Sequence, residues 1–269
     1  MSKAEDLQSL VHNPLHRRDF AKKMATGALA IAGVAALPGS VELLAQSITD
    51  VDILNFALNL EYLEGEFYSV ATTGQRLADA GVGITGKGRA GATTGGAKVS
   101  LDDFTGFAAM QITIDEQAHV NLLRGALKGD AVAKPEINLE ALGVGFRNQA
   151  EFLTVAAIFE DVGVSAYGGA APLIDSTQIL GAAARIALTE AQHAGVLRSL
   201  VSRAALAIPQ VDPKAIPTIG NANGRLFFVD GNGLSIVRTP SEVLKIVYGG
   251  GTSSGGFFPA GVNGAISRA

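Results

Sequence analysis

One short pattern occurs twice in this chain and constrains its fold more than any other feature. A glutamate followed three positions later by a histidine lies in two apolar segments, as Glu116 with His119 and as Glu190 with His193. Residues three apart share one face of a helix, so each segment directs a carboxylate and an imidazole to the same side. The sequence contains four histidines, and the other two lie near the N-terminus. The pattern therefore predicts helices that hold metal ligands between them.

Apolar residues at alternating spacings of three and four predict four long helices and one short helix. The expected long helices are residues 50–72, 100–128, 146–171 and the segment from the Asp175-Ser176 cap to 207, and the short one is 241–248. Ser100 with Asp103 resembles a capping box for the second helix. The Gly/Thr-rich stretch 73–99 has neither a helical nor a strand period and is expected to form a long surface loop. Four long helices predict an all-α four-helix bundle.

The first and third helices match each other, as the second and fourth do. Glu61 and Tyr68 have the same seven-residue spacing as Glu160 and Tyr167, so the chain is interpreted as a duplicated helical hairpin. Two equivalent hairpins that pack about a pseudo-twofold axis bring six ligand-type side chains into the middle of the bundle. The predicted metal ligands are Glu61, Glu116, His119, Glu160, Glu190 and His193.

Burial of four carboxylates in an apolar core is unfavourable by several kcal/mol per ion unless positive charge compensates them. The four helical seams contain no Lys or Arg, whereas two divalent cations would neutralise the cluster. The chain has no Cys, so the ligands must be carboxylate and imidazole, which suit iron, manganese or zinc. The alternative is that the glutamates face solvent and the histidines are ordinary core or surface residues.

Three further residues are candidates to support the ligands by hydrogen bonds. Glu64 breaks the internal repeat, because Gly163 takes its place in the second half; it either supports or supplements the ligands or turns to solvent. Tyr68 and Tyr167 lie two turns from the glutamates of their own helices, where they either contact the site or simply fill the core. Glu66 lies off the seam and is expected to be solvated.

Residues 1–46 resemble a twin-arginine export signal. Residues 16–22 (HRRDFAK) precede a charge-free apolar run, 24–37, that is too short for an ordinary transmembrane helix. We therefore expect an exported, periplasmic protein whose signal is removed and which keeps no stable membrane anchor. The bundle is assigned to 47–208. The Gly/Pro-rich remainder, 209–269, is expected to contain a hairpin around residues 230–233 and the short helix.

The six ligand-type residues resemble the ferritin-like superfamily of di-iron and di-manganese carboxylate bundles. More narrowly, residues 59–68 (NLEYLEGEFY), 239–244 (TPSEVL) and 255–259 (GGFFP) are similar to exported ferritin-like proteins related to plant desiccation-associated proteins. The resemblance implies that Glu116 and Glu190 bridge two metals, while Glu61 and Glu160 each bind one.

That resemblance implies a centre that reacts with oxygen or peroxide, as a ferroxidase or a catalase-like enzyme, in oxidative or desiccation stress. The alternative is a non-catalytic stress protein in which the metals hold the bundle together. A net charge of −4 without a basic stripe excludes a nucleic-acid partner. The missing Cys excludes an attached rubredoxin, and the long loop and tail disfavour a storage cage. An oligomer is left open.

Overall fold

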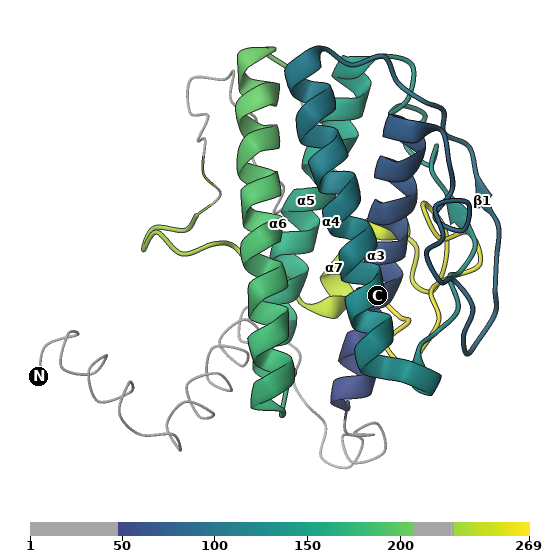
Figure 1. The fold of residues 1–269 in the computed structure, drawn as a ribbon. Helices are drawn as coiled ribbons and strands as arrows, with labels where there is room; N and C mark the ends of the chain where they lie inside the picture. Colours follow the sequence, from purple (N-terminus) through teal and green to yellow (C-terminus); the bar gives the residue numbers. More distant parts are fainter. Residues whose placement is uncertain (1–47, 207–226, 228) are drawn as a thin grey trace, which may run out of the picture. The chain divides into compact units, whose positions relative to one another are not determined.

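Four long helices carry all six predicted ligands, and the prediction of an all-α bundle is confirmed in a computed structural model. The structure describes residues 48–206, 227 and 229–269, so the export-signal segment 1–46 lies outside the described residues. The bundle helices are α3 (Asp50–Thr73), α4 (Asp103–Leu127), α5 (Gln149–Ala170) and α6 (Thr177–Arg203). Figure 1 shows them running alongside one another. None of the helices in the described part is long and apolar enough to cross a membrane.

The start of α4 differs from the predicted capping box. Asp102, not Ser100, caps this helix, and its carboxylate accepts a hydrogen bond from the Thr105 backbone N–H at 2.7 Å. Gln149 at the start of α5 explains why Asp102 is the cap. Its side-chain oxygen accepts a hydrogen bond from the Asp102 backbone N–H, and its side-chain nitrogen donates one to the Asp102 carboxylate, both at 2.7 Å. A tertiary contact between two helix ends therefore selects the cap, and a local sequence pattern cannot contain it. The predicted cap of α6 by Ser176 is confirmed.

The loop after α3 is largely exposed, as predicted, but it also contributes residues to the core. It places Leu77, Val82 and Val99 in the core, and its short strand β1 (Thr93–Thr94) pairs in parallel with β2 (Ile137–Asn138). Leu77 packs closely over Gly65 of α3, where an added Cβ would lie 3.1 Å from the leucine side chain. The loop thus covers the side of α3 that faces away from the other helices, which explains why α3 is buried along nearly its whole length.

The described part of the C-terminal extension belongs to the same compact unit as the bundle. Helix α7 (Pro240–Val247) buries Val243 and Leu244 completely. The chain just before α7 approaches α5 so closely that a Cβ on Gly169 would lie 1.8 Å from the Arg238 carbonyl oxygen. Gly169 is thus needed for close approach of the tail. Of the predicted hairpin, the turn is described through an antiparallel bridge between Val229 and Ser235, while most of the first strand lies outside the described residues.

Candidate metal centre

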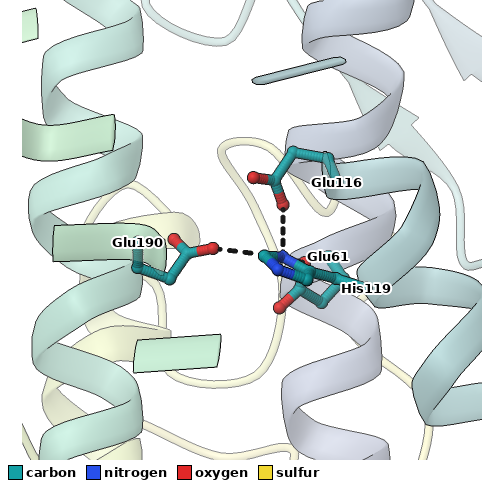
Figure 2. A group of neighbouring side chains, drawn as sticks. All are labelled: Glu61, Glu116, His119 and Glu190. Carbon is teal, nitrogen blue, oxygen red and sulfur yellow. Dashed lines mark hydrogen bonds and ion pairs between the residues drawn. The ribbon is translucent and has the colours of Figure 1, made fainter. Parts of the chain in front are cut away.

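The structure brings all six predicted ligand residues together in two overlapping groups. Their ligand atoms lie within 4.8 Å of one another in each group. The first group is Glu61, Glu116, His119 and Glu190, shown in Figure 2, and the second is Glu116, Glu160, Glu190 and His193. Glu116 and Glu190 belong to both groups. This geometry suits shared ligands between two ions, while the metal-binding role of each residue stays a prediction.

Three carboxylates converge on one nitrogen in the first group. His119 Nδ1 lies 3.3 Å from an oxygen of each of Glu61, Glu116 and Glu190. An imidazole nitrogen has a single N–H or a single lone pair, so it cannot satisfy three acceptors. Separations of about 3 Å are those expected between neighbouring ligand atoms that share a metal at about 2.1 Å.

The second group repeats this arrangement around His193. Its Nδ1 lies 3.2 Å from Glu116 Oε1 and 3.2 Å from Glu160 Oε2. The four glutamates are completely buried, and the histidines are exposed by only 8% and 7%. Each group combines residues of three helices, so the two hairpins have to dock before either group is complete.

Unsatisfied carboxylate oxygens show that these residues fit a cation. Within the described residues, the four glutamates have buried oxygens without a hydrogen-bond partner: Glu61 Oε2, Glu116 Oε1, Glu160 Oε1 and both oxygens of Glu190. Three of these oxygens lie within ion-pair distance of a histidine nitrogen but lack hydrogen-bond geometry. Buried acceptors without partners are rare, because each loses its hydration. A donor set of carboxylates and imidazoles around such oxygens is chemically suited to divalent metal.

Comparison with known proteins places this bundle in a family. A family model described as "Ferritin-like domain" matches residues 49–203, which is more than half of the chain. The chain belongs to the ferritin-like domain family. A relative of this ferritin-like protein is "Ferritin-like catalase Nec2" from Nesocodon mauritianus, with 24% identity over 268 residues, covering 81% of this chain and 85% of that protein.

Burial and mutual repulsion shift the acidities in this ferritin-like cluster. Burial, followed by the charge of Glu61, raises the pKa of Glu116 to about 7 although both histidines act against this. Burial and the neighbouring Glu116 and Glu160 raise the pKa of Glu190 well above its usual range. Burial also acts to raise the pKa of Glu61, but the hydrogen bond and charge of His119 outweigh it and the net direction is downward.

The pKa values of both histidines are raised, which favours the protonated imidazole. Burial acts to lower the pKa of His193, but hydrogen bonds to Glu116 and Glu160 outweigh it and raise the value to about 11. Burial likewise acts to lower the pKa of His119, but hydrogen bonds to three carboxylates, those of Glu116, Glu190 and Glu61, outweigh it and raise the pKa. Without metal, protons therefore supply the positive charge that the carboxylates need, and metal binding must release them.

We expect the metal-free protein to lose stability as the pH rises. Glu116 has a folded pKa of about 7 against 4.5, so the folded state binds more protons than the unfolded chain between these values and stability falls across that window. His193, at about 11 against 6.5, continues the decline, because the stability it contributes below pH 6.5 is lost as the pH approaches its folded pKa.

Thermal unfolding of chelator-treated protein between about pH 5 and pH 9 measures this effect. The melting temperature should fall by several degrees as the pH rises, on the order of a few kcal/mol of stability. Metal-loaded protein serves as the control and should not show the decline, because deprotonated ligands bind metal more tightly. A metal-free melting temperature that rises with pH would contradict the proposed proton occupancy.

The two tyrosines contact the glutamates of the opposite hairpin. Tyr167 of α5 donates a hydrogen bond to Glu61 Oε1 of α3. Tyr68 of α3 is completely buried, and the nearby Glu160 of α5 contributes after burial itself to raising the pKa of its hydroxyl. The Tyr68 hydroxyl has no hydrogen bond of good geometry within the described residues. The tyrosines therefore contact the predicted ligands and link the two hairpins, where the sequence left open whether they contact the site or simply fill the core.

Glu64 points inward beside the centre, although it belongs to neither ligand group. Its Oε1 would lie 3.1 Å from a Cβ on Gly163, and Glu190 Oε2 would lie 2.6 Å from the same position. Gly163 thus leaves room for both carboxylates, which explains this break in the repeat. Burial and then Glu190 raise the pKa of Glu64 well above its usual range. Glu64 also lines a cavity of about 20 Å³ with apolar residues of α3, α5 and the tail, which is room for about one water molecule.

Two carboxylates next to predicted ligands in the chain were missed from the sequence, and one of them contacts a predicted ligand. Asp115 Oδ2 lies 3.1 Å from His193 Nε2, the nitrogen that faces away from Glu116 and Glu160. Asp161 accepts two hydrogen bonds from Arg198, at 2.9 and 2.6 Å. A signal was available, because Asp115 directly precedes Glu116, Asp161 directly follows Glu160, and Arg198 belongs to a Leu-Arg pair that the repeat contains twice.

The expectation that Glu66 is solvated was wrong. Its side chain is only 1% exposed, and one carboxylate oxygen lies 3.7 Å from the ammonium group of Lys134, which is 3% exposed. The Lys134 ammonium group also donates hydrogen bonds to the Gly91 carbonyl at 2.9 Å and to Thr93 Oγ1 at 2.7 Å. Acceptors in the loop segment 91–93 thus help to hold Lys134 beside Glu66, a tertiary contact that the helical periodicity of α3 does not reveal.

Proposed function

We propose that this ferritin-like protein binds two iron or manganese ions and disproportionates hydrogen peroxide. The observation that carries the proposal is the pair of four-residue groups that share Glu116 and Glu190, with buried carboxylate oxygens that lack partners among the described residues. The name of the relative from Nesocodon mauritianus describes a ferritin-like catalase, and this supports peroxide as the substrate.

The bound metals would accept two electrons from one peroxide molecule, which leaves as oxygen, and return them to a second, which is reduced to two water molecules. The protein residues would then have three tasks. The two shared glutamates hold the ions close together, and the apolar core excludes bulk water. The Tyr167 hydroxyl donates to Glu61 and so fixes the orientation of one carboxylate that binds a single ion.

The test is metal content per chain by elemental mass spectrometry, followed by oxygen release on addition of peroxide to the same sample. We expect about two iron or manganese ions per chain and one oxygen molecule for every two peroxide molecules consumed. Protein reloaded with zinc is the matched control, because it should keep the stability of the metal-bound fold but release no oxygen. Zinc has no redox chemistry.

Other outcomes separate the remaining functions. Oxygen consumption on addition of ferrous iron, without peroxide turnover, would indicate a ferroxidase. Two bound ions with neither activity would support a stress-related protein in which the metals stabilise the bundle. Protein purified without metal under metal-replete expression would overturn the metal centre itself.

Export is a further part of the proposed function, and it rests on the paired arginines at 17 and 18 in residues 1–46. We expect replacement of Arg17 and Arg18 by Lys to leave the precursor in the cytoplasm, measured by cell fractionation and immunoblotting. Replacement of Lys23 by Arg, which preserves charge and lies just outside the motif at 16–22, is the control. Unchanged export of the precursor that lacks both arginines would contradict a twin-arginine signal.

A further inference from the structure

The two histidines of the centre differ in the contact made by their outer nitrogen. His193 Nε2 lies 3.1 Å from the Asp115 carboxylate, whereas the ion pairs of His119 in the described part of the chain involve Nδ1. The repeat explains the difference. Thr189 precedes Glu190 as Asp115 precedes Glu116, and its hydroxyl donates to the Arg185 carbonyl in its own helix at 3.2 Å.

A carboxylate on the outer nitrogen changes an imidazole as a metal ligand. It fixes the proton on Nε2, leaves the Nδ1 lone pair free for the metal, and holds the ring in place. His193 Nδ1 is the nitrogen that faces Glu116 and Glu160, so the Asp115 contact prepares the ring in the correct tautomer. In the described part of the chain, His119 makes its ion pairs through Nδ1 alone, so its ring must lose conformational freedom and choose a tautomer when it binds.

We propose that the two metal positions have unequal affinity, and that the position formed by Glu160 and His193 fills before the position formed by Glu61 and His119. This inference rests on the proposed two-metal centre and adds an order of loading to it. Asp115 acts as a positioning residue through His193. Loss of such an outer contact weakens metal binding by about 10-fold to 100-fold, which sets the expected difference.

Glu64 is a second departure from the repeat and must be separated from Asp115. It lies beside Glu190 Oε2, while Glu190 Oε1 faces His119. Within the described residues, the ion pairs of the two histidines are made with other carboxylates and not with Glu64. It therefore does not select a tautomer, and we expect it to contribute little to the order of loading.

The test is calorimetric titration of metal-free, full mature protein with Zn²⁺, which reports binding without catalysis. The wild-type protein should show two steps of one ion each, with the first stronger. His193→Gln should remove the stronger step, and His119→Gln should remove the weaker one. Asp115→Ala should weaken the first step by about 10-fold to 100-fold. Titration with Co²⁺, followed by its visible absorption, gives a second readout of each position.

The chain offers a matched gain-of-function variant. Thr189→Asp places a carboxylate at the equivalent point of the repeat and should strengthen the second step, while Thr189→Val should leave both steps unchanged. Two ions bound with equal affinity, or a first step unaffected by Asp115→Ala, would overturn the inference. If the Glu64→Gln variant bound its two ions with equal affinity, the difference between the positions would come from Glu64, and this would also overturn the inference. Absence of any zinc binding would instead refute the proposed metal centre.

Discussion

Glu116→Ala protein should purify without either metal, whereas Glu61→Ala protein should retain one ion. The structural reason is that Glu116 belongs to both ligand groups and Glu61 to the first alone. Glu190→Ala should behave as Glu116→Ala does. Elemental mass spectrometry on the purified variants measures the difference directly. A Glu116→Ala protein that carries two ions would contradict the shared role of this carboxylate.

The same variant should lose the stability that metal binding confers. A ligand present at about 1,000 times its dissociation constant stabilises a fold by about 4 kcal/mol, so Glu116→Ala should melt well below the metal-loaded wild type. In chelator the difference should shrink, because the wild type then loses the stabilisation by metal and keeps a buried Glu116 whose pKa is raised by its burial. Asp103→Ala, which removes an exposed carboxylate from the same helix, is the control and should keep both ions.

Glu66→Ala should destabilise the protein by about 3–5 kcal/mol without changing its metal content. The substitution leaves Lys134, which is 3% exposed, without its carboxylate partner, and a buried charge without a partner is strongly unfavourable. Burial already lowers the pKa of Lys134, while Glu66 acts to raise it. Urea unfolding of the variant and the wild type gives the difference in free energy.

A pair of control variants separates charge from packing. Asp130→Ala removes one partner of the exposed Lys87–Asp130 pair and should cost no more than about 1 kcal/mol. A double variant with Met at positions 66 and 134 should recover most of the loss, because it removes both charges while it fills similar volume. If Glu66→Ala were as mild as Asp130→Ala, the buried ion pair would be unimportant for stability.

The parts of the fold that follow local periodicity were predictable. The bounds of α3 and the six residues that meet in mid-bundle follow from seams of apolar residues interrupted by glutamate and histidine at fixed spacings. Duplication of the hairpin added long-range information that a single motif lacks. The repeat predicted that six ligand-type side chains meet in mid-bundle, and the structure brings these six together in two overlapping groups.

The predictions failed where contacts between distant segments determine a helix cap or the burial of a side chain. Asp102 caps α4 because Gln149 of another helix holds it. Glu66 is buried beside Lys134 of the connection between α4 and α5, and the loop after α3 accepts a hydrogen bond from that lysine. The tyrosines share a spacing with their own glutamates but contact those of the opposite hairpin. Helical spacing defines which face a residue occupies, but not which neighbour that face meets.

Glu116 and Glu190 each complete the ligand group of the opposite hairpin, so metal binding at the proposed centre would require the two hairpins to dock. Each hairpin supplies three members of one group and receives the fourth from the other. Neither half of the chain therefore contains a complete set, and loading of the proposed centre would require contacts that are remote in sequence. Bound metal would consequently report on assembly, because a chain that holds both ions would have docked its two halves correctly.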